Sequence, residues 1–272
     1  MRFATSDLDW QTRRFLITVK ATPNPSTKYG ETVCVGGIAL DSGQWTRLYP
    51  VPFRDLAEDK KFKKYTVVEA SVGKASEDRR PESHKINVDS IKKVGYLDTK
   101  NGWARRKEIV LPTTSQSFCE ILRQQETSDL SMAAFRPAEV AFSWEKASVR
   151  DGDRRDACYA QLSFINPMRR ALEPVPYNFR YQFRCAGELD CPGHDLPIID
   201  WELSAAWYHW HKRDQNVDSL LAKIKHNWLD VVCSPERDTL FFVGNTKRFR
   251  DVFMVGGVFF PPRSGRRLRV VG

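Results

Sequence analysis

The sequence predicts an α+β protein, mainly β, with two tandem OB-like β-barrel modules, then a two-helix segment and a C-terminal β-hairpin. Short runs rich in β-branched and aromatic residues, separated by turn residues, fill the first two thirds of the chain. Apolar residues at helical spacing follow after residue 200, and two apolar runs close the sequence. The predicted modules span 1–110, 111–195 and 196–272, which a chain of 272 residues can accommodate.

The first module is predicted from four short strands without a long helix between them. The turn Asp41-Ser42-Gly43 joins two of these strands closely enough for a hairpin. This pattern favours a small barrel or sandwich. The strands are Phe15–Val19, Thr32–Leu40, Trp45–Tyr49 and Tyr65–Val72.

The second module begins with a helix at Ser117–Gln125, where Ser117 and Glu120 have the spacing of a capping box. Three strands are predicted after it, at Glu139–Trp144, Cys158–Phe164 and Tyr177–Arg184. In the last strand, alternation places Phe179, Tyr181 and Phe183 on one buried face and leaves Arg180 and Arg184 facing outward.

Two amphipathic helices are predicted next, from about Asp200 to Lys212 and from the N-cap Asn216 to about Val232. The runs Leu240–Val243 and Phe253–Phe260 then pair as a hairpin across a turn that contains Gly244-Asn245.

Composition excludes several classes of protein. Hydrophobic residues make up 41% and charged residues 28%, as in ordinary globular proteins, so extensive disorder is not expected. The longest apolar run, 252–262, is too short to span a membrane. The first 14 residues lack the apolar core of a secretory signal, so we expect a cytoplasmic protein with reduced cysteines and no membrane partner.

Positive charge is concentrated at the two ends of the chain. Residues 1–110 carry 21 basic and 14 acidic residues, 111–246 carry 15 and 19, and 247–272 carry 7 and 1. The resulting pattern of +7, −4 and +6 favours a polyanion as partner, because clustered Lys and Arg gain by releasing phosphate counterions. A basic protein without a nucleic-acid role remains the alternative.

Candidate nucleic-acid contacts follow from strand alternation and from paired basic residues. Trp45, Arg47 and Tyr49 share one strand face, a combination that can stack on bases and hold phosphate. Basic residues near strand ends are suited to grip a strand at the loops of a small barrel. The further candidates are Lys60, Lys61, Lys63, Lys64, Arg79, Arg80, Arg180, Arg184, Arg266 and Arg267.

A metal site is predicted on one turn-rich loop. Cys185, Cys191 and His194 place two thiols and an imidazole within ten residues, a donor set that suits tetrahedral zinc. We favour Cys158 as the fourth ligand because its strand can lie beside the one that ends at Cys185. The alternatives are Cys119, Cys233, or the carboxylate of Asp195 or Asp200.

The same region allows a rival function, a metal-dependent nuclease or hydrolase that uses His194, Asp200 and Glu202 as base and metal-binding groups. In the structural alternative, Asp200 is a helix N-cap and Glu202 a first-turn acid. The phosphate-binding loop, the dinucleotide fingerprint and the nucleophile elbow are absent from the sequence. A third possibility is a protein-interaction scaffold.

The run Lys28-Tyr29-Gly30-Glu31-Thr32-Val33-Cys34-Val35-Gly36-Gly37-Ile38, followed by Gln44-Trp45-Thr46-Arg47-Leu48, resembles the opening of dual OB-fold domain proteins of bacterial conflict systems. The likeness extends loosely over about the first 190 residues. It implies binding of DNA or RNA, with or without modified bases, through Trp45 and Arg47, and protein partners in a phage-defence or restriction assembly. The Cys185/Cys191/His194 loop and the C-terminal elements depart from the family's pattern.

Overall fold

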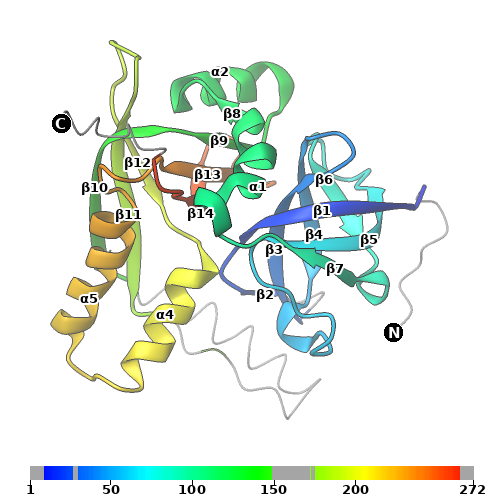
Figure 1. Cartoon of the computed structure of the whole chain (residues 1–272), viewed down its shortest axis with the longest axis horizontal. Helices are drawn as coiled ribbons and strands as arrows, with labels where there is room; N and C mark the ends of the chain where they lie inside the picture. Colours follow the sequence, from blue (N-terminus) through cyan, green and yellow to red (C-terminus); the bar gives the residue numbers. More distant parts are fainter. Residues whose placement is uncertain (1–8, 27–29, 149–171, 173–174, 264–272) are drawn as a thin grey trace, which may run out of the picture.

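The computed structural model describes residues 9–26, 30–148, 172 and 175–263. Its elements form an α+β fold that is mainly β, as the sequence predicts (Figure 1). The strand predicted at 158–164 lies outside the described residues. None of the helices in the described ranges is long and apolar enough to cross a membrane.

The first unit is a closed five-stranded barrel. The order is β1-β3-β4-β6-β5, and β1 pairs with both β3 and β5, which closes the sheet. The pair β4–β6 is parallel and the others are antiparallel. This is the small Greek-key barrel expected for an OB-like module. The strands are β1 (Gln11–Lys20), β3 (Gly30–Ala39), β4 (Trp45–Val51), β5 (Thr66–Lys74) and β6 (Ser83–Ile86).

Two further strands extend the barrel sheet. β2 (Asn24–Ser26) pairs with β3, and β7 (Lys92–Tyr96) pairs with β5. The barrel interior is filled by side chains that include Phe15, Val35 and Leu48. The predicted hairpin at Asp41-Ser42-Gly43 is confirmed, with Gly43 at φ 69°, where a residue without Cβ avoids strain.

The second unit contains two smaller sheets with helices packed on them. One sheet has the order β10-β11-β12 and the other β14-β13-β9-β8. Phe179, Tyr181 and Phe183 of β11 are buried, as predicted. The strands are β8 (Thr114–Ser115), β9 (Met132–Phe135), β10 (Pro137–Lys146), β11 (Tyr177–Cys185), β12 (His194–Pro197), β13 (Leu240–Asn245) and β14 (Phe253–Phe259).

The predicted C-terminal hairpin is β13–β14, but it is not separate from the preceding residues. β13 also pairs with β9, and one hydrophobic core joins Phe118, Phe183, Leu220 and Phe253. A boundary at residue 195 therefore cuts through a shared sheet and a shared core. The sequence did not show this because the β9–β13 pairing joins segments about a hundred residues apart.

The predicted helices after residue 110 are present with their predicted caps. α2 (Phe118–Ser128), α4 (Trp201–His211) and α5 (Val217–Lys225) begin after Ser117, Asp200 and Asn216, and each cap side chain accepts a backbone N–H of the first turn. A π-helical turn, η4 (His226–Val231), continues α5. Short 3-10 turns occur at η1 (Phe53–Asp55), η2 (Val88–Ser90) and η3 (Leu111–Thr113).

The sequence analysis missed α1 (Lys100–Val110), which links β7 to η3. Asn101, Gly102 and Trp103 have left-handed backbone angles at its start, and the N-cap Thr99 makes no side-chain cap hydrogen bond, so the helix lacks a regular first turn. The conformation is costly for Trp103, and ring contacts with Tyr65 and Phe259 at 6.1 and 5.4 Å hold it in place.

The second unit packs directly on the outer face of the barrel at β3 and β4. A Cβ at Gly36 would lie 2.4 Å from Met132 Cε of β9, so glycine permits this approach. Arg47 Nη2 donates to the Ser131 carbonyl at 2.8 Å. The buried Glu82 carboxylate accepts from the Ser131 backbone N–H at 3.0 Å and its hydroxyl at 2.6 Å. These paired buried groups fix the two units in one arrangement.

A buried ion pair adds a second link between the units. Lys64 of the barrel is 2.6 Å from the Asp200 carboxylate and 3.1 Å from that of Glu202. Burial alone would lower the pKa of Lys64, but the two carboxylates raise it above its ordinary value. The contribution of Lys64 to stability is thus fully present below its ordinary pKa of 10.5 and is lost only at higher pH.

We predict that Lys64→Met lowers the free energy of unfolding by about 3–5 kcal/mol, because it leaves the Asp200 charge buried without its cation. Urea denaturation followed by tryptophan fluorescence measures the loss. Glu202→Gln, at a half-exposed position, should cost less than about 1 kcal/mol. The double variant Lys64→Met/Asp200→Asn should recover part of the stability. A Lys64→Met protein as stable as the parent contradicts this role of the pair.

Candidate metal centre

Three thiols and one imidazole converge in the second unit. The Sγ atoms of Cys119, Cys185 and Cys191 and a ring nitrogen of His194 all lie within 4.8 Å of one another. Cys119 is the second residue of α2, Cys185 ends β11, and His194 begins β12. Cys191 lies in the loop 186–193. The cluster therefore ties one helix, two strands and their connecting loop to a single point, and could hold a metal ion.

Three of the six separations between the ligand atoms are close to the edges of a tetrahedral site. His194 Nε2 lies 3.3 Å from the Sγ of both Cys119 and Cys191, and the Sγ atoms of Cys119 and Cys185 are 3.8 Å apart. Metal–sulfur arms of about 2.3 Å at tetrahedral angles give sulfur–sulfur edges of about 3.8 Å. With all of its ligand atoms within 4.8 Å of one another, the cluster has about the size of a site for one shared ion.

The loop that carries Cys191 has the backbone needed to turn back toward β11. Gly187 and Gly193 have φ of 77° and 84°, in the region that favours glycine. The Cys191 N–H donates to the Glu188 carbonyl at 3.2 Å, and Arg184 Nη2 donates to the Cys191 carbonyl at 2.6 Å. The turn chemistry in the sequence thus positions the thiol.

Aromatic rings surround the imidazole on its inner side. The rings of Phe118 and Phe183 lie 4.8 and 5.3 Å from that of His194. Burial lowers the pKa of His194. The neutral form, which is the form that binds metals, is therefore favoured at neutral pH.

The three thiols do not ionise equally. Burial and the neighbouring Cys185 thiol raise the pKa of Cys119 to about 12, and burial also raises that of Cys185. Burial disfavours the Cys191 thiolate too, but the N–H groups of Gly193 and Cys185 lower its pKa overall. A bound cation would have to stabilise three thiolates together, so binding should release protons and weaken in acid.

The structure thus brings together three of the four ligands predicted from the sequence, and Cys119 provides the fourth potential ligand. Cys158, the favoured candidate, lies outside the described residues. Cys119 carries a sequence signal that we did not weigh. It lies two residues after the capping residue Ser117, in the first turn of a predicted helix, where the helix dipole favours an anion even though burial and the Cys185 thiol raise the pKa of this thiol.

The three residues proposed for a hydrolase, His194, Asp200 and Glu202, do not form one common site. His194 belongs to the cysteine cluster, whereas Asp200 caps α4, accepts the Glu202 N–H at 3.0 Å and pairs with Lys64. Among the described residues, the four-residue cluster is the one group of three or more potential metal ligands within reach of a single ion. The structural alternative for Asp200 as an N-cap is confirmed.

The prediction that Arg47 faces outward on β4 to contact nucleic acid is wrong. Its side chain is buried against Ser131 of the second unit. Trp45 is partly buried, and its ring lies 5.3 Å from that of Phe242 in an edge contact. Tyr49 is 41% exposed. The side chains of β4 alternate between the two faces as predicted. The pattern of a single strand does not reveal, however, that another part of the chain covers its outer face.

Two further predicted contacts, Lys64 and Arg80, are also buried. Arg80 is bound by Asp78 and donates to the Asn245 carbonyl at 2.8 Å. Its guanidinium holds the pKa of Asp78 to about 2, against the effect of burial. These charges serve the interface between the units, so an outward position is wrong for both.

The remaining candidates lie nearer the surface, several of them in ion pairs. Arg180 is 2.7 Å from Asp195, Lys61 is 2.5 Å from Glu58, and Arg79 is 3.9 Å from Asp129. Lys60 donates to the Asp89 carbonyl at 2.8 Å, while Arg184 is exposed and binds the Cys191 carbonyl. Lys63 lies over the ring of Tyr96 at 4.0 Å. Arg266 and Arg267 lie outside the described residues.

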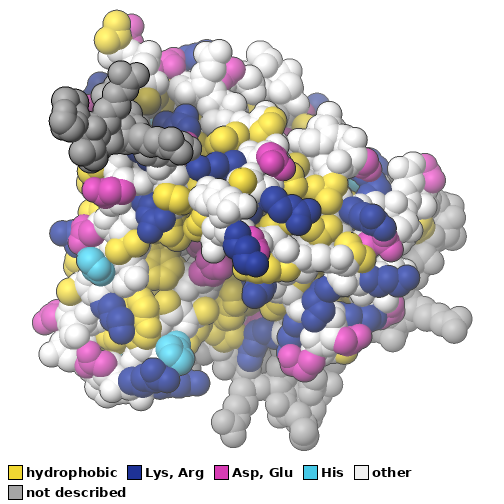
Figure 2. Space-filling view, in the orientation of Figure 1, with side chains coloured by type: hydrophobic (Ala, Val, Ile, Leu, Met, Phe, Trp, Pro, Cys, Tyr) yellow, Lys and Arg dark blue, Asp and Glu magenta, His cyan; other side chains and the backbone are white. Residues whose placement is uncertain are grey.

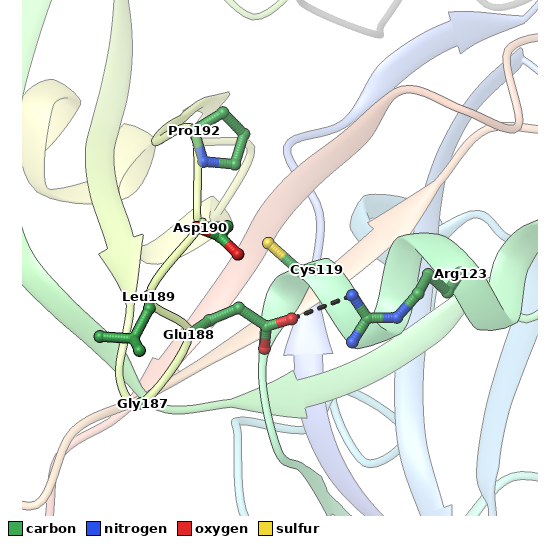
Figure 3. A pocket seen from close by; sticks show the side chains of 7 residues that line it. All are labelled: Cys119, Arg123, Gly187, Glu188, Leu189, Asp190 and Pro192. Atoms are coloured by element: carbon green, nitrogen blue, oxygen red, sulfur yellow. Dashed lines mark hydrogen bonds and ion pairs between the residues drawn. The ribbon is translucent and has the colours of Figure 1, made fainter.

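An open depression of about 520 Å³ borders the cluster on one side (Figure 3). Cys119 and Arg123 of α2 line one wall, and Glu188, Asp190 and Pro192 of the loop line the other. An ion pair of 2.9 Å between Arg123 and Glu188 crosses it. The depression thus reaches a metal-ligand candidate from solvent.

Comparison with known families identifies two domains of unknown function, one designated DUF8758 over residues 11–112 and the other DUF8757 over residues 114–270. The second covers more than half of the chain, which therefore belongs to the DUF8757 family. The ranges meet at η3, where the barrel ends and the second unit begins. A search of curated proteins finds no match.

We predict that a strong chelator lowers the melting temperature of the purified protein, because a metal bound at the cluster adds its binding free energy to folding. Cys185→Ser should lower the melting temperature without chelator and should abolish the further effect of chelator. Differential scanning fluorimetry measures both. Cys233→Ser, a half-buried thiol outside the cluster, should keep the chelator response of the parent. Equal chelator responses in all three proteins would exclude a stabilising metal.

Proposed function

We propose that this protein binds nucleic acid through a basic surface on β7 and α1, and that zinc in the cysteine cluster holds the second unit in shape. The observation that carries the first part is the charge of β7 and α1, residues 92–110. Six basic residues stand there against the two acids Asp98 and Glu108, and all but the buried Arg106 are at least partly exposed: Lys92, Lys93, Lys100, Arg105, Arg106 and Lys107. Figure 2 shows Lys and Arg side chains across the middle of this face.

The strand and the helix present much of this charge to solvent. All five residues of β7 are exposed, and Lys100 and Arg105 of α1 are exposed too. Within the described chain β7 pairs with β5 alone, so its other edge is open. Lysines on an edge strand also discourage sheet-to-sheet association, which is the alternative explanation for Lys92 and Lys93.

Aromatic and basic groups interleave at the centre of this surface. Tyr96 is 45% exposed, with Lys63 over its ring at 4.0 Å. Arg106, which is buried, donates from Nη2 to the Tyr96 hydroxyl at 3.1 Å and stacks 3.8 Å from the buried Tyr65 ring, so it supports the Tyr96 ring from beneath the surface. A fixed aromatic ring among cations is the arrangement by which proteins hold single strands, through base stacking and phosphate contacts.

The C-terminal end adds to the same surface. Lys107 Nζ donates to the Pro262 carbonyl at 3.1 Å, so the described chain ends beside α1. The sequence beyond residue 263, which lies outside the described residues, contains Arg266, Arg267 and Arg269. We propose that these arginines extend the basic surface, which would give a single strong polyanion site in place of two weak ones.

The surface on β7 and α1 differs from the one predicted on β4. The outer face of β3 and β4 is the one with which OB-folds commonly bind oligonucleotides, and here the second unit covers part of it. The resemblance to dual OB-fold proteins supports DNA or RNA, with or without modified bases, as the ligand and a bacterial defence assembly as the setting. The choice of β7 and α1 as the binding surface rests on the positive charge and the solvent exposure of their residues.

Zinc is the ion we propose for the cluster, because three thiolates and one imidazole form one of its common structural donor sets. The four ligands leave no open position for substrate. Such a site would stabilise the loop 186–193 and the start of α2, and would not itself catalyse hydrolysis. This arrangement favours a binding protein over the metal-dependent hydrolase considered from the sequence.

We predict that Lys92→Gln/Lys93→Gln weakens binding to a fluorescent 20-nucleotide single strand and lowers the slope of log affinity against log salt by about 1.4, for two lost phosphate contacts. Fluorescence anisotropy at several salt concentrations gives the slope. Arg213→Gln/Lys225→Gln removes the same charge from exposed positions on the α4–α5 pair and should leave the slope unchanged. An equal decrease of the slope in both variants would indicate that binding depends on the net charge of the protein and not on the surface at β7 and α1.

Removing residues 264–272 should lower the same slope by up to about 0.7–0.9 for each phosphate contact that Arg266, Arg267 or Arg269 makes. The melting temperature should not change, since these residues follow the last strand. Circular dichroism checks the fold, and the anisotropy titration is repeated with single-stranded and double-stranded DNA and RNA. A truncated protein with an unaltered slope on all ligands would remove the tail from the binding surface.

A further inference from the structure

We infer that Cys119 is the site at which an oxidant attacks the cysteine cluster, and that its oxidation by a peroxide joins it to Cys185 and releases the bound metal. Exposure distinguishes it from the other two thiols. Cys185 is 5% exposed and Cys191 2%, whereas Cys119 is only partly buried and lines the open depression. Cys119 lines this depression and the other two thiols do not, so a small reagent that enters it from solvent meets the Cys119 sulfur first.

The second sulfur needed for a disulfide is already adjacent. The Sγ atoms of Cys119 and Cys185 are 3.8 Å apart, and a disulfide requires about 2.05 Å. Forming the bond requires the two sulfurs to approach each other by a little under 2 Å. Of the three thiols, Cys119 thus combines access to solvent with a partner sulfur.

The reaction has two steps. The Cys119 sulfur attacks one oxygen of hydrogen peroxide, the O–O bond breaks, and the other oxygen leaves as water after protonation, which makes a sulfenic acid. The Cys185 sulfur then attacks the Cys119 sulfur, the S–S bond forms, and the sulfenic oxygen leaves as a second water. Two thiolates, two protons and one peroxide thus give one disulfide and two waters.

Loss of the metal follows from loss of its ligands. This step rests on the proposed zinc site, since two of the four donors would be consumed in the disulfide. Cys191 and His194 would remain, too few for a closed tetrahedral site. The loop 186–193 would then lose the ion that ties it to α2, while a thiol reductant would restore the original ligands.

The test uses the purified full-length protein with its metal content measured first. Limiting N-ethylmaleimide followed by peptide mass spectrometry should modify Cys119 at least about tenfold faster than Cys185 or Cys191, because the reagent cannot reach the two buried sulfurs whatever their ionisation. One equivalent of hydrogen peroxide should then release metal to a chromophoric chelator and give a Cys119–Cys185 disulfide, and dithiothreitol should reverse it.

Variants separate the possible outcomes. Cys233→Ser should keep the parent's release rate, whereas Cys119→Ser should lose the disulfide. If Cys119→Ser fails to fold, mass-spectrometric mapping of the modified and disulfide-bonded cysteines in the parent protein still tests the inference. A disulfide between Cys185 and Cys191, or release of metal with Cys119 unmodified, would overturn the inference. A purified protein without zinc would instead refute the proposed metal, while the maleimide rates would still test the accessibility of Cys119.

Discussion

The packing of the second unit on the outer face of the barrel is the constraint on which the rest of the structure depends. It buries Arg47 and Glu82 around Ser131 and places Lys64 against Asp200, so charges that a sequence would assign to the surface hold the molecule together. It also covers part of the barrel face at β3 and β4, whereas the residues of β7 stay exposed, and this difference is why the proposed binding surface lies on β7 and α1.

The metal cluster has a different role in the same architecture. The core of the second unit joins residues from α2 to β14, but the loop 186–193 has few apolar side chains of its own, and Leu189 is 97% exposed. Such a loop gains little from hydrophobic burial. Its position depends on two glycines, a few hydrogen bonds and the convergence of Cys185, Cys191 and His194 with Cys119. A bound ion would supply the stability that packing does not.

Much of the fold could be predicted from local pattern. The caps Ser117, Asp200 and Asn216, the hairpin at Gly43 and the buried face of β11 each depend on neighbours in the sequence, and each is confirmed. The pairing of β9 with β13 and the burial of Arg47 depend on segments far apart, so no local pattern could indicate them. α1 was missed because its first turn is left-handed and lacks a cap. Three metal-ligand candidates were found because they lie on one loop, while Cys119 comes from a helix about seventy residues earlier.

The central claim is that one tetrahedral zinc is held by three sulfurs and one nitrogen. X-ray absorption spectroscopy at the zinc edge, on protein purified without added metal, tests it directly. The account predicts about one zinc per chain with three Zn–S distances near 2.3 Å and one Zn–N distance near 2.0 Å. The Cys119→Ser protein should show at most two sulfur ligands. A spectrum dominated by oxygen ligands, or a protein with no zinc at all, would contradict the claim.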